Sequence, residues 1–147
     1  MIRLLFSRRN HPNSWLVRAV SWSQWSHVEI MLPDGRLLGA SAPQGVGLCT
    51  YEERMLHASH AATLCVPGDM NAAADWGETQ LGKPYDYVGV IGLGFHRNWE
   101  EDNKWWCSEF VAEFLVQGGF APYRADAIQR LTPQHLWMLN YPFEIVK

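Results

Sequence analysis

The chain has 147 residues, of which 48% are hydrophobic and 18% are charged. This length fits one domain, expected over residues 1–147, and the apolar share can build a core, which excludes a disordered segment and a disulfide-stapled miniprotein. The formal net charge is −3 and no long basic run exists, so the electrostatic surface that nucleic-acid binding requires is missing and no nucleic-acid partner is expected.

The first half of the chain is expected to consist mainly of strands. Residues 2–7 form a short buried strand, and a helix follows over 13–20 with Asn13 as its cap. Residues 27–32 alternate apolar and polar side chains, and the turn Pro33-Asp34-Gly35 leads into an antiparallel partner over 36–40. Residues 45–48 extend this hairpin, and residues 61–66 form a further strand.

The second half is expected to be mainly helical. A helix over 70–81 begins at an Asp69 cap and ends at Gly82. The clearest helical pattern covers 105–117, where an apolar stripe opposes a polar one, and Gly118-Gly119 ends it. With a closing strand over 143–146, this order predicts an α+β domain in which a small antiparallel sheet packs against helices.

Cysteine usage and the lack of long apolar segments bear on the compartment. Three cysteines are an odd number without zinc-type spacing, which suits a reducing environment. The apolar start of the chain is too short for a secretory signal, and the run 88–95 is far shorter than the roughly 20 residues of a membrane span. We therefore expect a soluble, cytoplasmic protein with no transmembrane segment.

Cys107 is the candidate nucleophile. It stands at the beginning of the helix over 105–117, where unpaired amides and the positive end of the dipole favour a thiolate. Trp106 precedes it and provides a bulky ring to wall a cleft beside the sulfur. A buried structural cysteine explains the same position, and Cys49 and Cys65, in strand-like apolar contexts, are interpreted in that way.

His27 is the best candidate for the base that a thiol nucleophile requires. Period-two geometry places it with Glu29 on one side of the strand over 27–32, where the carboxylate could accept a hydrogen bond from the ring. The alternative is two polar residues on the solvent face of a half-buried strand. His57 and His60 are three apart but no third ligand stands nearby, so a solvated turn is preferred and no metal is expected.

Two pieces of the sequence, read together, resemble a known family. The first is Ser26-His27-Val28-Glu29-Ile30, with Pro33-Asp34-Gly35 and Gly45-Val46, and the second is Leu81-Gly82-Lys83-Pro84-Tyr85-Asp86-Tyr87 followed by Trp106-Cys107-Ser108-Glu109-Phe110-Val111. They are similar to the histidine and cysteine halves of a papain-like NlpC/P60 domain. The histidine comes first here, 80 residues before the cysteine (107 − 27). That order, with Thr132-Pro133 and Leu136, resembles the circularly permuted branch that includes the YiiX/YaeF-like proteins and the lecithin:retinol acyltransferase relatives.

The resemblance, which spans residues 26–136, implies a permuted papain-like fold with the nucleophile at the N-terminus of a helix. It implies that His27 acts on Cys107, that Tyr85 lies near the nucleophile and helps to stabilise an oxyanion, and that Trp106 contributes to this oxyanion and substrate-binding region. A packing role for Tyr85 remains open.

The chain departs from the family at the third catalytic position. Relatives place a polar residue on the strand after the histidine, about twelve to fifteen residues on, where this chain has Gly39, Ala40, Ser41 and Ala42. Only Ser41 is polar, so Glu29 is the candidate for the orienting role. Residues two apart on a strand are roughly 6–7 Å apart at the backbone, so Glu29 must bend back to reach the ring.

These residues predict a cysteine hydrolase that attacks an amide or ester carbonyl and forms an acyl-enzyme intermediate. The substrate class is a peptide, an amide or an acyl lipid, and no metal or organic cofactor is implied. Transfer of the acyl group to an amine or lipid would make the protein an acyltransferase. The alternative from another class is a non-catalytic binding or assembly module with the same fold, which the unfilled third position favours.

Overall fold

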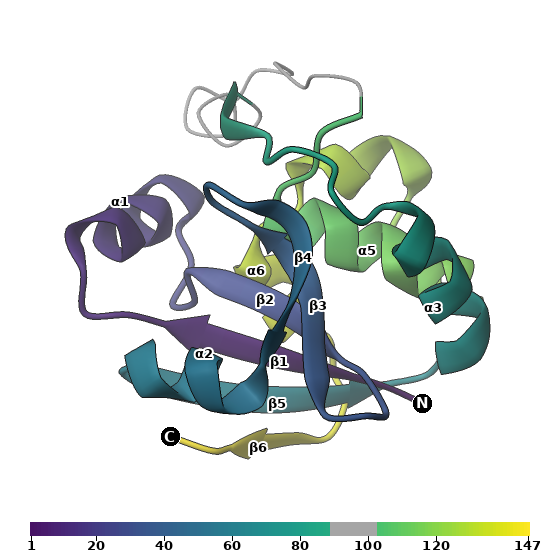
Figure 1. Ribbon diagram of the computed structural model, residues 1–147, viewed down its shortest axis with the longest axis horizontal. Helices are drawn as coiled ribbons and strands as arrows, with labels where there is room; N and C mark the ends of the chain where they lie inside the picture. The colour runs from purple at the N-terminus through teal and green to yellow at the C-terminus, as the bar shows by residue number, and fades with distance from the viewer. Residues whose placement is uncertain (89–102) are drawn as a thin grey trace.

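The computed structural model describes residues 1–88 and 103–147 and has a mixed α+β architecture (Figure 1). The apolar run 88–95 lies outside the described residues apart from Val88. The strands in the described part are β1 (Ile2–Arg8), β2 (His27–Met31), β3 (Arg36–Ser41), β4 (Gly45–Thr50), β5 (His60–Val66) and β6 (Phe143–Ile145). The helices are α1 (Pro12–Ser21), α2 (Tyr51–His57), α3 (Met70–Thr79), α5 (Cys107–Gln117) and α6 (Pro133–Trp137), with a 3₁₀ helix, η1 (Ala125–Arg130).

The strands form one six-stranded sheet in the order β4-β3-β2-β1-β5-β6, and every pairing is antiparallel. The expected antiparallel sheet and its hairpin at Pro33-Asp34-Gly35 are therefore confirmed. β2 lies inside the sheet between β3 and β1, so its backbone is held from both sides and its side chains have fixed directions.

Both faces of the sheet are covered. Alternate side chains such as Leu4, Phe6 and Ile30 point to the face where α5 packs, and they form the larger core. Their neighbours Leu5 and Leu37 point to the opposite face, in a smaller cluster that includes side chains of α2. Because period two sends neighbouring side chains to opposite faces, residues of β2 can contact both layers.

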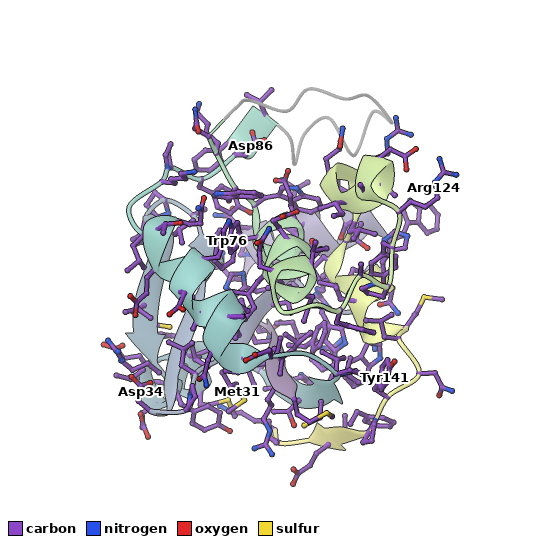
Figure 2. The ribbon with its side chains drawn as sticks, turned by 90° about the vertical axis from the view of Figure 1, so that its right-hand side faces the viewer. Met31, Asp34, Trp76, Asp86, Arg124 and Tyr141 are labelled. Atoms are coloured by element: carbon purple, nitrogen blue, oxygen red, sulfur yellow. The ribbon has the colours of Figure 1, made fainter. Side chains whose placement is uncertain are left out.

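Helices α3 and α5 lie side by side on the larger core (Figures 1 and 2). Trp76 of α3 stacks on Phe110 of α5, with ring centroids 5.6 Å apart. Gly77 permits this approach, since a Cβ there would lie 3.0 Å from the Phe114 ring. The packing holds the N-terminal turn of α5 against the sheet.

Some helix boundaries differ from the expectations, for local reasons. α1 begins one residue before Asn13, because the His11 side chain accepts a hydrogen bond from the Asn13 N–H and Pro12 occupies the first turn. α3 ends at Thr79 rather than at 81, and the chain turns before Gly82. α5 begins at Cys107 rather than at 105, because the extended residue Trp106 is its cap. None of the described helices is long and apolar enough to cross a bilayer.

Candidate active site

His27 and Glu29 contact each other at the start of β2. Nε2 of His27 lies 3.2 Å from Oε1 of Glu29, an ion-pair contact rather than a well-aligned hydrogen bond. The glutamate side chain bends back along the strand to make it. Glu29 is only 2% exposed, so this face of β2 is not a solvent face at that position.

Arg54 of α2 holds the other side of the same carboxylate. Its Nε donates to Oε2 of Glu29 at 2.6 Å, and its Nη2 donates to Oε1 at 2.5 Å, a bidentate pair. α2 is started by a capping box in which Thr50 and Glu53 exchange hydrogen bonds, and this sets where Arg54 falls on the helix. The thiol of Cys49 completes the cluster, with Sγ 3.6 Å from Oε1 of Glu29.

Gly39 of β3 makes room for the glutamate. A Cβ at this position would lie 2.8 Å from Cγ of Glu29, closer than atoms can approach. The lack of a side chain on the neighbouring strand therefore lets the carboxylate lie between β2 and α2. Ser41, the polar residue at the expected third position, lines both cavities near this cluster but makes no hydrogen bond to His27 among those the structure shows for the described residues.

The buried charges shift one another's protonation. Burial acts to lower the pKa of His27, but the Glu29 charge and a hydrogen bond with Cys107 outweigh it and raise the pKa from 6.5 to about 9. Burial acts to raise the pKa of Glu29, but His27 and Arg54 lower it from 4.5 to about 2. At neutral pH the cluster therefore contains an imidazolium, a carboxylate and a guanidinium.

Cys107 is the first residue of α5 and is 2% exposed. Its thiol is the hydrogen-bond partner of His27 named above. Trp106 provides no side-chain cap, so the first-turn amides of α5 are left to other acceptors. Ser108 anchors the turn, because its Oγ donates to the Leu131 carbonyl at 2.8 Å.

Tyr85 is brought to the site by a close backbone approach. Gly45, with φ +82°, lies against Lys83, and a Cβ there would meet the Lys83 oxygen at 2.1 Å. Val46 N–H donates to that oxygen, and Tyr85 pairs with Trp105 just before α5. Burial and the charge of Cys107 raise the pKa of Tyr85, so its phenol keeps its proton and remains a donor.

A cavity of about 580 Å³ opens beside this group, and His27 and Tyr85 are both in its wall. Its lining is rich in hydroxyl groups, from Ser7, Ser14, Ser26, Ser41 and Ser59. A second cavity of about 430 Å³ lies against Glu29, Cys49 and Arg54.

The structure thus brings together four of the five predicted site residues: His27, Glu29, Cys107 and Tyr85. Trp106 is 3% exposed and serves as the cap of α5, and it does not line either cavity. Sequence reasoning missed Arg54, although the Thr50-x-x-Glu53 pattern marks the start of its helix.

The histidine pair expected in a solvated turn is separated by the end of a helix. His57 ends α2 and His60 begins β5, and both are exposed. Within residues 1–88 and 103–147, no group of three or more His, Cys, Asp or Glu side chains is placed to hold a metal ion.

Comparison with known proteins supports the fold. No protein-family model matches the chain. A 74-residue segment is 35% identical to part of a light-independent protochlorophyllide reductase polypeptide of Roseobacter denitrificans, a match that covers 50% of this chain and 12% of that protein. The crystal structure of the metalloprotein YiiX from Escherichia coli O157:H7 superposes with a TM-score of 0.71 at 15% identity, covering 99% of this chain and 95% of that one. The chain therefore has a YiiX-like fold.

Proposed function

We propose that the protein is a cysteine hydrolase of the permuted papain-like type, with Cys107 as nucleophile and His27 as its acid–base partner. The observation that carries the proposal is the contact of His27 with both the Cys107 thiol and the buried Glu29 carboxylate. A nucleophile, a base and an orienting group in contact are what thiol catalysis requires. The order of histidine before cysteine on a YiiX-like fold supports the permuted assignment.

The charges favour an ion pair as the resting state. With a pKa of about 9, His27 is an imidazolium at neutral pH, and it stabilises the thiolate form of Cys107. Because Nε2 faces Glu29, Nδ1 is the ring nitrogen left for the sulfur. Glu29 orients the ring and holds its charge, and Arg54 keeps Glu29 in place.

The reaction then proceeds in two steps. The thiolate adds to an amide or ester carbonyl, and the first-turn amides of α5 and the Tyr85 hydroxyl donate to the oxyanion. His27 protonates the leaving group as the carbon–heteroatom bond breaks, which leaves a thioester on Cys107 and a neutral imidazole. The imidazole takes a proton from water as its oxygen attacks the thioester, which releases the acid and restores the ion pair.

The lining of the larger cavity favours hydrolysis of a polar substrate over transfer of a long acyl chain. Five serines line it, and apolar side chains such as Val17 are a minority. A long acyl chain is bound in mainly apolar pockets.

The first test is the rate at which each cysteine reacts with iodoacetamide across pH, followed by peptide mass spectrometry. We expect Cys107 to react faster than Cys49 and Cys65 at neutral pH, and to lose this advantage in His27→Ala. A Cys107 that reacts no faster than the other two, or that is indifferent to His27→Ala, contradicts the proposal.

Burial of Cys107 favours the second candidate, a binding module that does not turn over substrate. The two are separated with p-nitrophenyl acetate. An enzyme releases p-nitrophenol with transient acetylation of Cys107 and stops doing so in Cys107→Ser, whereas Cys65→Ser, the control, behaves as wild type. A module gives neither a Cys107 thioester nor turnover.

A further inference from the structure

The larger cavity has a cationic wall next to the proposed catalytic pair. Arg9, Arg54, His11 and His57 line it together with His27, and no aspartate or glutamate is among its lining residues in the described part of the chain. Glu29, the nearest acid, faces the second cavity instead. A substrate in the larger cavity is therefore surrounded by donors and positive charge.

Arg9 is the cation of this wall that lacks a counter-charge. Arg54 is taken up by its bidentate pair with Glu29. Arg9 is exposed, and within residues 1–88 and 103–147 no carboxylate lies at ion-pair distance from it. Burial and the charge of Arg54 lower the pKa of Arg9, so a bound anion would relieve this repulsion.

We propose that this cavity binds an anionic group, a carboxylate or a phosphate, carried by the acyl substrate, with Arg9 as its main contact. The inference deepens the proposed function and rests on it, because the anion is placed by its distance from the thiol that attacks. Guanidinium groups bind the planar or tetrahedral oxygens of these anions through paired hydrogen bonds. The serine hydroxyls of the wall, Ser14 and Ser59 among them, supply further donors.

Two measurements test the anion site and its link to catalysis separately. The first is titration with inorganic phosphate, and in parallel with acetate, followed by the NMR shifts of the His57 ring; His60, which lines a different cavity, is the internal control. The second is the ratio of iodoacetate to iodoacetamide labelling rates at Cys107. Both are made in wild type, in Arg9→Gln and in Arg8→Gln. Arg8 is the matched control, since it is the adjacent residue and lines the cavity of His60.

We expect anions to shift His57 in wild type and Arg8→Gln but not in Arg9→Gln. We expect the iodoacetate-to-iodoacetamide ratio to fall roughly 3- to 10-fold in Arg9→Gln alone, and less at higher salt, because exposed charges are screened over about 8 Å at 0.15 M. The imidazolium of His27 also attracts iodoacetate, but it is present in all three chains. Stronger shifts with phosphate than with acetate identify a phosphate group, and the reverse identifies a carboxylate.

Anion-induced shifts that survive Arg9→Gln overturn the proposal. Shifts that Arg9→Gln abolishes, with an unchanged labelling ratio, also overturn it, because the anion would then not be part of a substrate at Cys107. If iodoacetamide fails to select Cys107 even in wild type, the proposed function fails, while the phosphate titration still decides whether the anion site exists.

Discussion

Replacing Glu29 with glutamine tests the electrostatic core of the site. The substitution keeps the shape of the side chain and removes the charge that Arg54 and His27 share. Arg54 has a side chain that is 11% exposed, so it would be left buried with no counter-charge. Breaking a buried pair by removing one partner costs about 3–5 kcal/mol, and we expect the free energy of unfolding at pH 7 to fall by about that amount.

The same substitution should reverse the pKa shift of His27. Burial alone lowers that pKa, and Glu29 is the main source of the opposing attraction, with Cys107 adding less. In Glu29→Gln the pKa should therefore drop from about 9 to below 6.5. The ring would then be neutral at pH 7, and Cys107 should lose its reactivity towards iodoacetamide.

The assay is an NMR titration of the His27 ring combined with urea unfolding. Glu52→Gln is the control, because Glu52 is exposed on α2 and its replacement should change stability by less than about 0.5 kcal/mol. The reasoning is refuted if His27 in Glu29→Gln still titrates near 9, or if this variant unfolds at the same urea concentration as Glu52→Gln.

A double-mutant cycle separates the lost pair from the stranded charge. Arg54→Met in the Glu29→Gln background removes the buried guanidinium that the first substitution leaves unpaired. We expect the double variant to be less destabilised than the sum of the two single variants, by more than about 1 kcal/mol. Additive effects would mean that the two side chains do not depend on each other.

Three further predictions follow from particular contacts. Gly39→Ala should displace Glu29, because its Cβ would lie 2.8 Å from Cγ; His27 then titrates below about 9 in NMR, whereas Gly47→Ala, with open space around it, leaves the titration unchanged. Stability in urea should be greatest between pH 4.5 and 6.5: the raised pKa of His27 stabilises the fold below 6.5 and this is lost as pH rises through about 9, and the lowered pKa of Glu29 stabilises it above 4.5 and this is lost as pH falls through about 2. Tyr85→Phe should slow p-nitrophenyl acetate turnover about 10-fold or more with little change in iodoacetamide labelling, since alkylation forms no oxyanion; equal loss of both would mean a structural role.

The strands and the position of the cysteine could be predicted because they depend on local patterns. Alternation over 27–32 and the Pro33-Asp34-Gly35 turn specify β2 and its hairpin, whatever packs on them. The helix of Cys107 has an apolar stripe wide enough to be read alone. The pattern predicts its start two residues early, because an extended Trp106 without a capping side chain leaves no mark in the sequence.

The partner of Glu29 could not be predicted, because it depends on which layer covers the second face of the sheet. Alternation places His27 and Glu29 on one side of β2 but does not say whether that side meets water. α2 is seven residues long with no buried residue, so its pattern does not indicate a packed helix. Only the folded chain brings Arg54, 25 residues away, onto the carboxylate.

The empty third position then has a structural explanation. A side chain on β3 at residue 39 would occupy the space that the Glu29 side chain fills, so a carboxylate on β2 and a large residue at 39 exclude each other. The chain has the carboxylate on the same strand as the histidine, a glycine opposite it, and an arginine from α2 to keep the carboxylate charged. Glu29 alone, facing one imidazolium in a buried site, would be free to rotate away or to take up a proton. With Arg54 bound to both of its oxygens it can do neither without breaking two hydrogen bonds, and for this reason we regard Arg54 as a positioning residue of the site.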